Sequence, residues 1–155
     1  MINGHQVVRL EFTSAFEMLD FVQVVSDHVT RTVGLDEETQ HWIGVAIRES
    51  VINAIKHGNR HDTSKHVFVE FATENRPDAF ELLIRVRDQG EGFDPSEIAD
   101  PLAPENLLKS SGRGIFLIRS FMDDVQLGLA PEGGMEIRMM KRVERHGSTG
   151  GAVQA

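Results

Sequence analysis

The sequence predicts an α+β fold, in which helices cover one face of a largely antiparallel, mixed sheet. Three observations predict it. One short strand is followed by two helical segments, two further strands come next, and the chain closes with a hairpin after a long glycine-rich segment. The chain has 155 residues, of which 40% are hydrophobic, which suits one core and is too little for two ordinary domains.

The N-terminal region is expected to form a strand and then a helix. Val7–Phe12 partly alternates between apolar and polar side chains, as a half-buried strand does. Thr13 or Ser14 can cap the helix that follows, with Glu17 three residues beyond Ser14 as in a capping box. Gly34 is expected to end this helix.

The second helix is expected to begin after Asp36, a favourable cap that two glutamates follow in the first turn. It is expected to run to Lys56 or His57. Gly58 and Asn59 mark its end, because both residue types tolerate left-handed backbone angles.

Strands and a long loop are expected in the second half of the chain. His66–Phe71 and Phe80–Arg87 are rich in β-branched and aromatic residues, and should form an antiparallel pair. Residues 88–114 read mostly as a loop, and a loop of this length in a compact domain usually has a function.

A helix over Ile115–Met122 and a hairpin of Val125–Leu129 with Met135–Arg142 complete the predicted domain, which spans residues 1–142. Residues 143–155 are expected to form a disordered tail.

Composition narrows the class of protein. A formal charge of −8 and a pI near 5.3 disfavour nucleic acid as a partner. Apolar runs are too short for a membrane span or a signal peptide, so no membrane association is expected. The absence of cysteine fits a reducing compartment, and a cytoplasmic protein is expected.

Polar residues recur every four positions on the second predicted helix, at Glu49, Asn53 and His57. They span only about 80° of the helix surface and form one stripe. Taken alone, such a stripe is more often a solvated face. A carboxylate, an amide and an imidazole in a row nevertheless offer a proton acceptor, an oxygen ligand for a hard cation and a further hydrogen-bonding group.

Two glycine-containing turns are further candidates. Asp88 directly follows a strand, and Gly90 and Gly92 would let a flat ring approach the backbone, so this turn can accept a hydrogen bond from an exocyclic amine of a base. Gly112 and Gly114 flank an arginine and open the helix near residue 115, which is a natural site for phosphate. Alone, either segment could be an ordinary turn or linker.

In this order the three features resemble the ATPase fold shared by gyrase, Hsp90, histidine kinases and MutL. The stripe corresponds to the N box, and the two turns correspond to the two glycine boxes. This resemblance implies a Bergerat-type two-layer sandwich with an ATP lid. Within the superfamily, Glu49–Asn59 and Gly112–Asp123 are most similar to the anti-sigma-factor serine kinases.

The resemblance also implies roles for single residues. Asn53 would bind a Mg²⁺ ion, Asp88 would read the adenine of ATP, residues 95–111 would close as a lid, and Glu49 would be the general base. Arg113 would balance charge on the transferred phosphate, as a catalytic residue. The residues expected to contact the nucleotide are Asn53, His57, Asp88, Gly90, Gly92, Gly112, Arg113 and Gly114. For His57, stabilising the helix end is an equal alternative.

The expected partners, also implied by the resemblance, are a sigma factor, a small antagonist protein whose serine accepts the phosphate, and a second copy of the chain in a homodimer. One residue departs from the family pattern, because Met135 stands where relatives commonly have a threonine that helps hold the adenine-binding aspartate. Either adenine binding is weaker, or another hydrogen bond replaces the hydroxyl.

Three alternatives remain from the sequence. A detached histidine-kinase catalytic domain is disfavoured because the chain has no room for the helical hairpin that presents a phosphoacceptor histidine. A non-catalytic module could bind ATP only to sequester a partner. A metal site at His57 and His61 is disfavoured because the helix should end between them.

Overall fold

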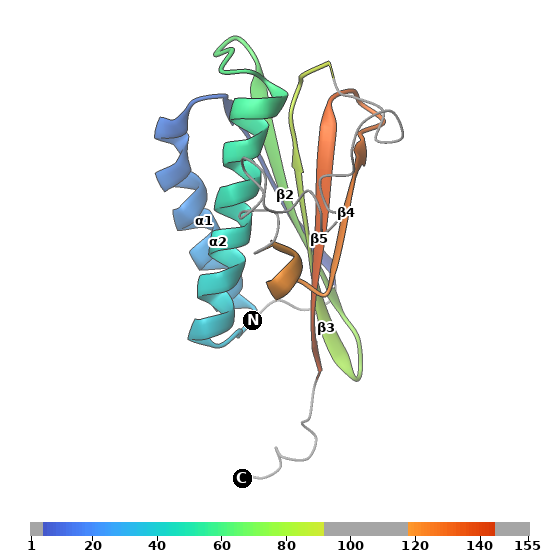
Figure 1. Ribbon diagram of the computed structural model, residues 1–155. Coiled ribbons are helices and arrows are strands. Elements are labelled where there is room, and N and C mark those ends of the chain that lie inside the picture. Colours follow the sequence, from blue (N-terminus) through green and yellow to red (C-terminus); the bar gives the residue numbers. More distant parts are fainter. Residues whose placement is uncertain (1–4, 92–117, 145–155) are drawn as a thin grey trace.

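The computed structural model describes residues 5–91 and 118–144. A layer of helices packs on a layer of strands (Figure 1). In chain order the elements are β1 (His5–Thr13), the 3-10 helix η1 (Phe16–Met18), α1 (Leu19–Thr32), α2 (Glu37–Asn53), the π-helix η2 (Ala54–Gly58), β2 (His66–Asn75), β3 (Ala79–Arg87), β4 (Asp124–Leu129) and β5 (Met135–Glu144).

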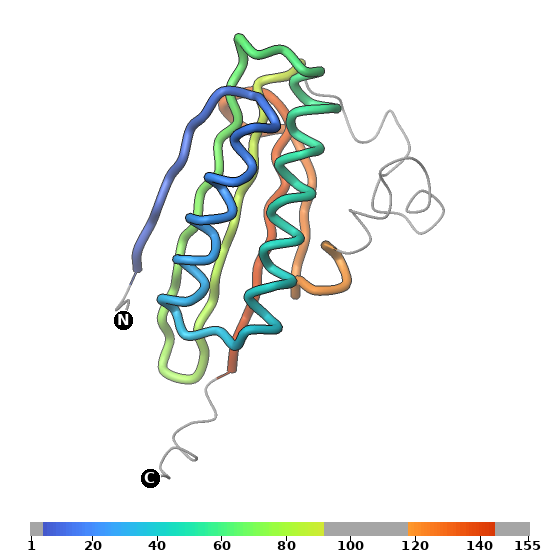
Figure 2. Tube along the Cα trace, turned by 90° about the vertical axis from the view of Figure 1, so that its left-hand side faces the viewer, coloured from blue at the N-terminus to red at the C-terminus, as the bar shows by residue number. Residues whose placement is uncertain are grey.

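The described strands form one five-stranded sheet in the order β1-β2-β3-β5-β4. Helices α1 and α2 lie side by side on one face of this sheet (Figure 2). The predicted α+β fold with helices on one face is therefore confirmed. The sheet was predicted to be largely antiparallel and mixed, and every pairing between the described strands is antiparallel.

The hydrophobic core lies between the two layers. Alternate residues of β2 and β3 point toward the helices, as strands with one buried face require. The side chains of these strands and of α2 that are at most 1% exposed include Val67, Val69, Phe71, Leu82, Ile84, Val86, Ile43, Ile47 and Val51. Because full burial of each such side chain is worth about 1.5–3 kcal/mol, this layer of contacts holds α2 on the sheet.

Of the start of α1, the end of α1 and the start of α2, only the start of α1 was predicted wrongly. Asp36 caps α2 by accepting a first-turn backbone N–H at 2.7 Å, and Gly34 follows α1 with a φ of +85°, as predicted. Ser14 caps no helix. Its backbone N–H donates to the carbonyl of Lys65 at 3.0 Å, and its buried hydroxyl has no hydrogen-bond partner among the described residues. The chain is therefore still extended here, and η1 precedes α1.

The end of the α2 helix differs from the prediction in detail. Helical structure continues as the π-helix η2, and the backbone N–H of Asn59 closes it by donating to the carbonyl five residues earlier at 2.7 Å. Gly58 and Asn59 mark the helix end as predicted, whereas the left-handed angles that both residue types tolerate occur at Arg60 (φ 54°) and His61 (φ 62°). Gly58 and Asn59 are instead used for contacts with β2 and β3, described below.

The segment before β4 is anchored on α2. Residues 118–121 are helical, within the helix predicted for 115–122. The ring of Phe121 stacks on Trp42 of α2, with centroids 4.0 Å apart and an interplanar angle of 7°. This stack fixes the end of the helix that follows the second predicted glycine box.

The closing hairpin of β4 and β5 is confirmed. Strand β5 continues to Glu144, two residues beyond the predicted domain end at Arg142, because Val143 and Glu144 still pair with β3. Residues 145–155 of the predicted tail lie outside the described residues.

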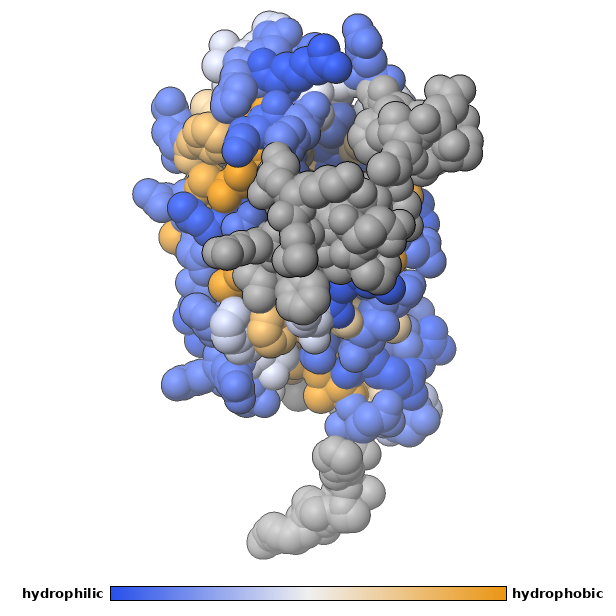
Figure 3. Space-filling view, in the orientation of Figure 1, coloured by the Kyte–Doolittle hydropathy of each residue, from blue (hydrophilic) through white to orange (hydrophobic). Residues whose placement is uncertain are grey.

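Hydrophilic residues cover most of the coloured surface in Figure 3, and hydrophobic ones gather mainly over the helical layer. The exposed apolar side chains of that layer include Phe16, Phe21 and Val24. Within residues 5–91 and 118–144, no helix has the length and apolar character needed to cross a membrane.

Candidate functional site

The polar stripe predicted on α2 is present. Glu49 and Asn53 are partly exposed, whereas the apolar residues of the opposite face are buried in the core. The two polar side chains are one turn apart on the same helix face, which points away from the sheet-facing residues. The helix therefore presents a carboxylate and an amide together.

Asn53 has a side-chain oxygen that could bind a metal ion. Its side-chain oxygen Oδ1 is buried and has no hydrogen-bond partner among the residues that the structure describes. Buried polar atoms are nearly always paired, so an orphaned amide oxygen at a helix surface suggests a partner that comes with a ligand. An amide oxygen is also a ligand type that Mg²⁺ and Ca²⁺ accept, so this residue fits the predicted metal role.

His57 lies in the π-helix η2, one turn beyond Asn53. Because the π-turn changes the rotation per residue, the regular four-residue stripe does not continue unchanged to His57. Partial burial lowers the pKa of His57, and the nearby charges of Lys56 and His61 lower it further. The imidazole is thus biased toward its neutral form.

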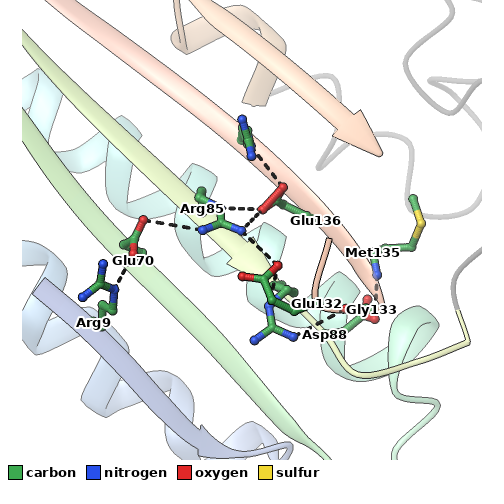
Figure 4. A network of polar contacts seen from close by, with 10 residues as sticks. Arg9, Glu70, Arg85, Asp88, Glu132, Gly133, Met135 and Glu136 are labelled. Carbon is green, nitrogen blue, oxygen red and sulfur yellow. Dashed lines mark hydrogen bonds and ion pairs between the residues drawn. The ribbon is translucent and has the colours of Figure 1, made fainter. Parts of the chain in front are cut away.

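Asp88 is a buried carboxylate at the end of β3, only 4% exposed. Its Oδ1 accepts the backbone N–H of Gly90 at 2.8 Å and that of Met135 at 3.0 Å. Its own backbone N–H donates to the carbonyl of Met135 at 3.0 Å, and Figure 4 shows the bond from the Met135 backbone N–H to the carboxylate. Both side-chain bonds fall on Oδ1, so the carboxylate is fixed in one orientation while Oδ2, which lies beside Gly58, carries neither of them.

Three glycines from distant parts of the chain surround Asp88. A Cβ atom at Gly58 would lie 1.9 Å from Asp88 Oδ2, and a Cβ atom at Gly134 would lie 2.1 Å from the Asp88 carbonyl oxygen. A Cβ atom at Gly90 would lie 2.1 Å from the carbonyl oxygen of Gly58. The end of η2, the turn after β3 and the hairpin before β5 therefore meet at Asp88, and none of them could do so with a side chain at these positions.

Asn59 holds this meeting point together. Its side chain is 1% exposed, accepts the backbone N–H of Gln89 at 2.8 Å and donates to the carbonyl of His66 at 3.0 Å. The Gln89 side chain in turn accepts the backbone N–H of His66 at 2.7 Å. Asn59 thus joins the helix end, the start of β2 and the residue after Asp88. Sequence reasoning missed this role, and the only signal was an asparagine next to Gly58.

Met135 contacts Asp88 through its backbone, and the effect of the missing threonine hydroxyl on adenine binding stays a prediction. Its backbone N–H, rather than a hydroxyl, donates to Asp88 Oδ1. The aspartate therefore has a partner at this position of the hairpin even though the Met135 side chain cannot form a hydrogen bond with it.

Glu49 and Asn53 lie on the same helical segment whose end contacts Asp88. Gly58 touches Asp88, and Asn53 lies five residues earlier in the same helical segment, about 7 Å along its axis. Glu49 lies about one further turn along it. The other predicted site residues, namely Gly92, Gly112, Arg113 and Gly114, and the lid at 95–111 lie outside the described residues.

Comparisons with known proteins show the family of this chain. Residues 12–141 match the family model of the histidine kinase-like ATPase domain. The anti-sigma F factor of Oceanobacillus iheyensis is 33% identical over 142 residues, which cover 88% of this chain and 92% of that protein. Serine-protein kinase RsbW of Bacillus cereus is 24% identical over 151 residues, which cover 94% of this chain and 90% of that protein.

A solved structure has the same fold. The RsbU and RsbW domains of Rv1364c from Mycobacterium tuberculosis match with a TM-score of 0.63 at 16% identity, over 90% of this chain and 33% of that chain. At this identity the likeness shows the fold alone. From the family match and the anti-sigma F factors it follows that the chain belongs to the histidine kinase-like ATPase family, as its sequence motifs predicted.

Proposed function

We propose that this chain is an anti-sigma factor with protein serine kinase activity, which transfers the γ-phosphate of ATP to a serine of an antagonist protein and otherwise holds a sigma factor inactive. The names of its relatives, anti-sigma F factor and serine-protein kinase, support this function. We also expect it to act in the cytoplasm, which the absence of cysteine favours, and as a homodimer, which the resemblance to the anti-sigma-factor serine kinases implies.

One observation carries the nucleotide part of the proposal: the fixed orientation of the buried Asp88 carboxylate within its three glycines. Oδ1 is held by two backbone N–H groups, so Oδ2 is available to accept a hydrogen bond from the exocyclic amine of adenine. Gly58 and Gly134 bring only backbone to this carboxylate, which leaves room for a flat ring. A buried acceptor with this geometry selects an amine over a carbonyl.

Asn53 is the residue that would hold a metal ion, through its unpaired Oδ1. When bound, Mg²⁺ supplies positive charge that neutralises the phosphate oxygens. Arg113, in the segment that the structure does not describe, is proposed to add a second positive charge next to the transferred phosphate.

Glu49 is proposed as the general base. It would accept the proton of the serine hydroxyl as that oxygen attacks the γ-phosphorus, while the bond from phosphorus to the β–γ bridging oxygen breaks and ADP leaves. Glu49 is partly exposed at the same helix face as Asn53, so its carboxylate can meet a hydroxyl that comes from another protein.

Phosphate transfer by Glu49→Gln tests the function. The protein, labelled ATP and the small protein that co-purifies with the chain are incubated, and acid-stable phosphoserine is measured. We expect wild-type protein to label its partner and Glu49→Gln to bind ATP but lose transfer by about 10²-fold or more. Transfer at the wild-type rate would remove Glu49 as the base. If the wild-type protein binds ATP but never labels its partner, and binds that partner equally with and without ATP, the chain is a non-catalytic binding module. If the label is lost in acid, the phosphorylated residue is a histidine.

A further inference from the structure

The hairpin turn between β4 and β5 is fastened to the end of β3 on both faces of the sheet. On the helix-facing side, the Met135 backbone N–H donates to Asp88, and Gly134 lies against the Asp88 backbone. On the opposite side, Nη1 of Arg87 donates to the carbonyl of Gly133 at 3.4 Å. Arg87 and Asp88 are neighbours in the chain, so their side chains leave the strand in opposite directions and hold the same turn from two sides.

Glu132 adds a second link on the outer side. Its Oε1 lies 3.5 Å from Nη2 of Arg85 and 3.9 Å from Nε of Arg87 (Figure 4). Glu132 itself belongs to the turn, whereas both arginines belong to β3. The turn is therefore tied to the strand through two positive charges.

Both arginines are held in place by contacts of their own. The guanidinium of Arg87 lies 3.9 Å above the ring of Phe68, and its side chain is only 15% exposed. Arg85 forms a further ion pair with Glu136, itself only 5% exposed, and another with Glu70 at 3.7 Å. Because β3 fixes these two cations, they act as rigid attachment points for the turn.

Neighbouring opposite charges favour the ionised forms of Arg85 and Glu132. Burial alone would lower the pKa of Arg85, but its hydrogen bond and ion pair with Glu136 outweigh that effect and raise it. The pKa of Glu132 is lowered, first by a hydrogen bond to its own backbone and then by the positive charges of Arg85 and Arg87. Arg85 and Glu132 are therefore ionised at neutral pH.

We propose that Arg87 and Glu132 are positioning residues for nucleotide recognition: from the outer face of the sheet they hold the turn at residues 130–134, so that Met135 and Gly134 keep the Asp88 carboxylate in its adenine-reading orientation. The proposal rests on the proposed reading of adenine by Asp88. Neither Arg87 nor Glu132 touches the nucleotide, because their side chains lie on the face of the sheet that the helices do not cover.

This arrangement predicts a defect in base selection rather than in phosphate binding. Inosine triphosphate carries a carbonyl where ATP carries the exocyclic amine, so a correctly oriented carboxylate accepts a hydrogen bond from ATP and repels inosine triphosphate. If the turn loosens, Asp88 loses its fixed orientation, and ATP affinity falls while affinity for inosine triphosphate changes little. The ratio of the two affinities isolates this effect from general losses.

The test measures the affinity of four proteins for the magnesium complexes of ATP and of inosine triphosphate by titration. The proteins are the wild type, Arg87→Met, Glu132→Gln and a control variant. The control is Glu81→Gln, which removes a hydrogen-bonded ion pair to Arg142, 2.9 Å long, at the far end of β3. We expect the preference for ATP to fall about tenfold in both test variants and to stay at the wild-type value in the control. Raising the salt concentration should also reduce the preference in the wild type more than in Glu132→Gln, because salt screens ion pairs.

The outcomes separate the two proposals. Wild-type protein that binds both nucleotides equally would contradict adenine reading by Asp88 itself. If the wild-type protein prefers ATP, and Glu132→Gln and Arg87→Met keep that preference within twofold, the positioning role is overturned. Since Glu132 is half exposed, Glu132→Gln is expected to fold, and it decides the question alone if Arg87→Met does not.

Discussion

Asn59 accepts the backbone N–H of Gln89 through its side-chain oxygen at 2.8 Å, and this bond ties the end of the long helix to the residue after Asp88. The same side chain donates to the carbonyl of His66 at 3.0 Å. One buried amide thus sets the spacing between the helix that carries Asn53 and the strand that carries Asp88. The proposed nucleotide site depends on that spacing.

Replacing Asn59 by alanine should destabilise the protein. The change leaves the backbone N–H of Gln89 and the carbonyl of His66 without their partner in the partly buried contact with Asn59, at a cost of about 1–3 kcal/mol. Urea denaturation measures this difference. Asn75→Ala is the matched control, because the Asn75 side-chain oxygen is buried without a hydrogen-bond partner among the described residues. Equal losses in the two variants would show that the Asn59 bonds carry no stability.

A methyl group at Gly58 should disturb Asp88 directly. The Cβ of Gly58→Ala would lie 1.9 Å from Asp88 Oδ2, so the carboxylate or the helix end must move. We expect ATP affinity to drop by at least tenfold, measured by calorimetry. Gly128→Ala is the control, since a Cβ atom there meets no atom within 4 Å. Unchanged affinity in Gly58→Ala would mean that this contact is not part of the site.

The unpaired oxygen of Asn53 should be needed for metal-dependent binding. Asn53→Ala removes that oxygen, and we expect no measurable binding of Mg·ATP in a calorimetric titration. Asn53→Asp keeps an oxygen at the same place and is expected to retain binding. If the alanine variant bound Mg·ATP as tightly as the wild type, the metal ligand would have to be sought elsewhere.

His57 should make stability depend on pH in the acidic range. Burial, followed by the charges of Lys56 and His61, holds its pKa below the usual value near 6.5. Between these two pKa values the unfolded chain binds more protons than the folded one, so stability is highest above about 6.5 and is lost as the pH falls toward the folded-state pKa. Thermal melting of His57→Gln at pH 5 to 7 should show a flatter pH dependence than that of the wild type. Identical slopes would exclude this contribution.

Much of the fold could be predicted because its signals are local. The alternation in β2 and β3, the Asp36 cap and the break at Gly34 each depend on residues within one element. Ser14 was misread because a serine before a helical pattern resembles a cap, whereas here its backbone is committed to a contact with Lys65 that no local pattern reveals.

The candidate site was predicted in part for the same reason. Asn53 and Asp88 stand out by residue type and position, so the sequence indicated them. The π-turn and the contact of Gly58 with Asp88 arise only when the helix end, β3 and the last hairpin pack together. Likewise, the bond from Met135 uses a backbone group, and side-chain identity gives no sign of it.

The central claim, that Asp88 reads the adenine of ATP, is tested most directly by calorimetric titration of Asp88→Asn with Mg·ATP. The asparagine keeps the size of the side chain but replaces an acceptor by an amide that cannot satisfy both the two backbone N–H groups and the adenine amine. We predict wild-type binding and no measurable heat for the variant. A folded Asp88→Asn protein with wild-type affinity for ATP would contradict the claim.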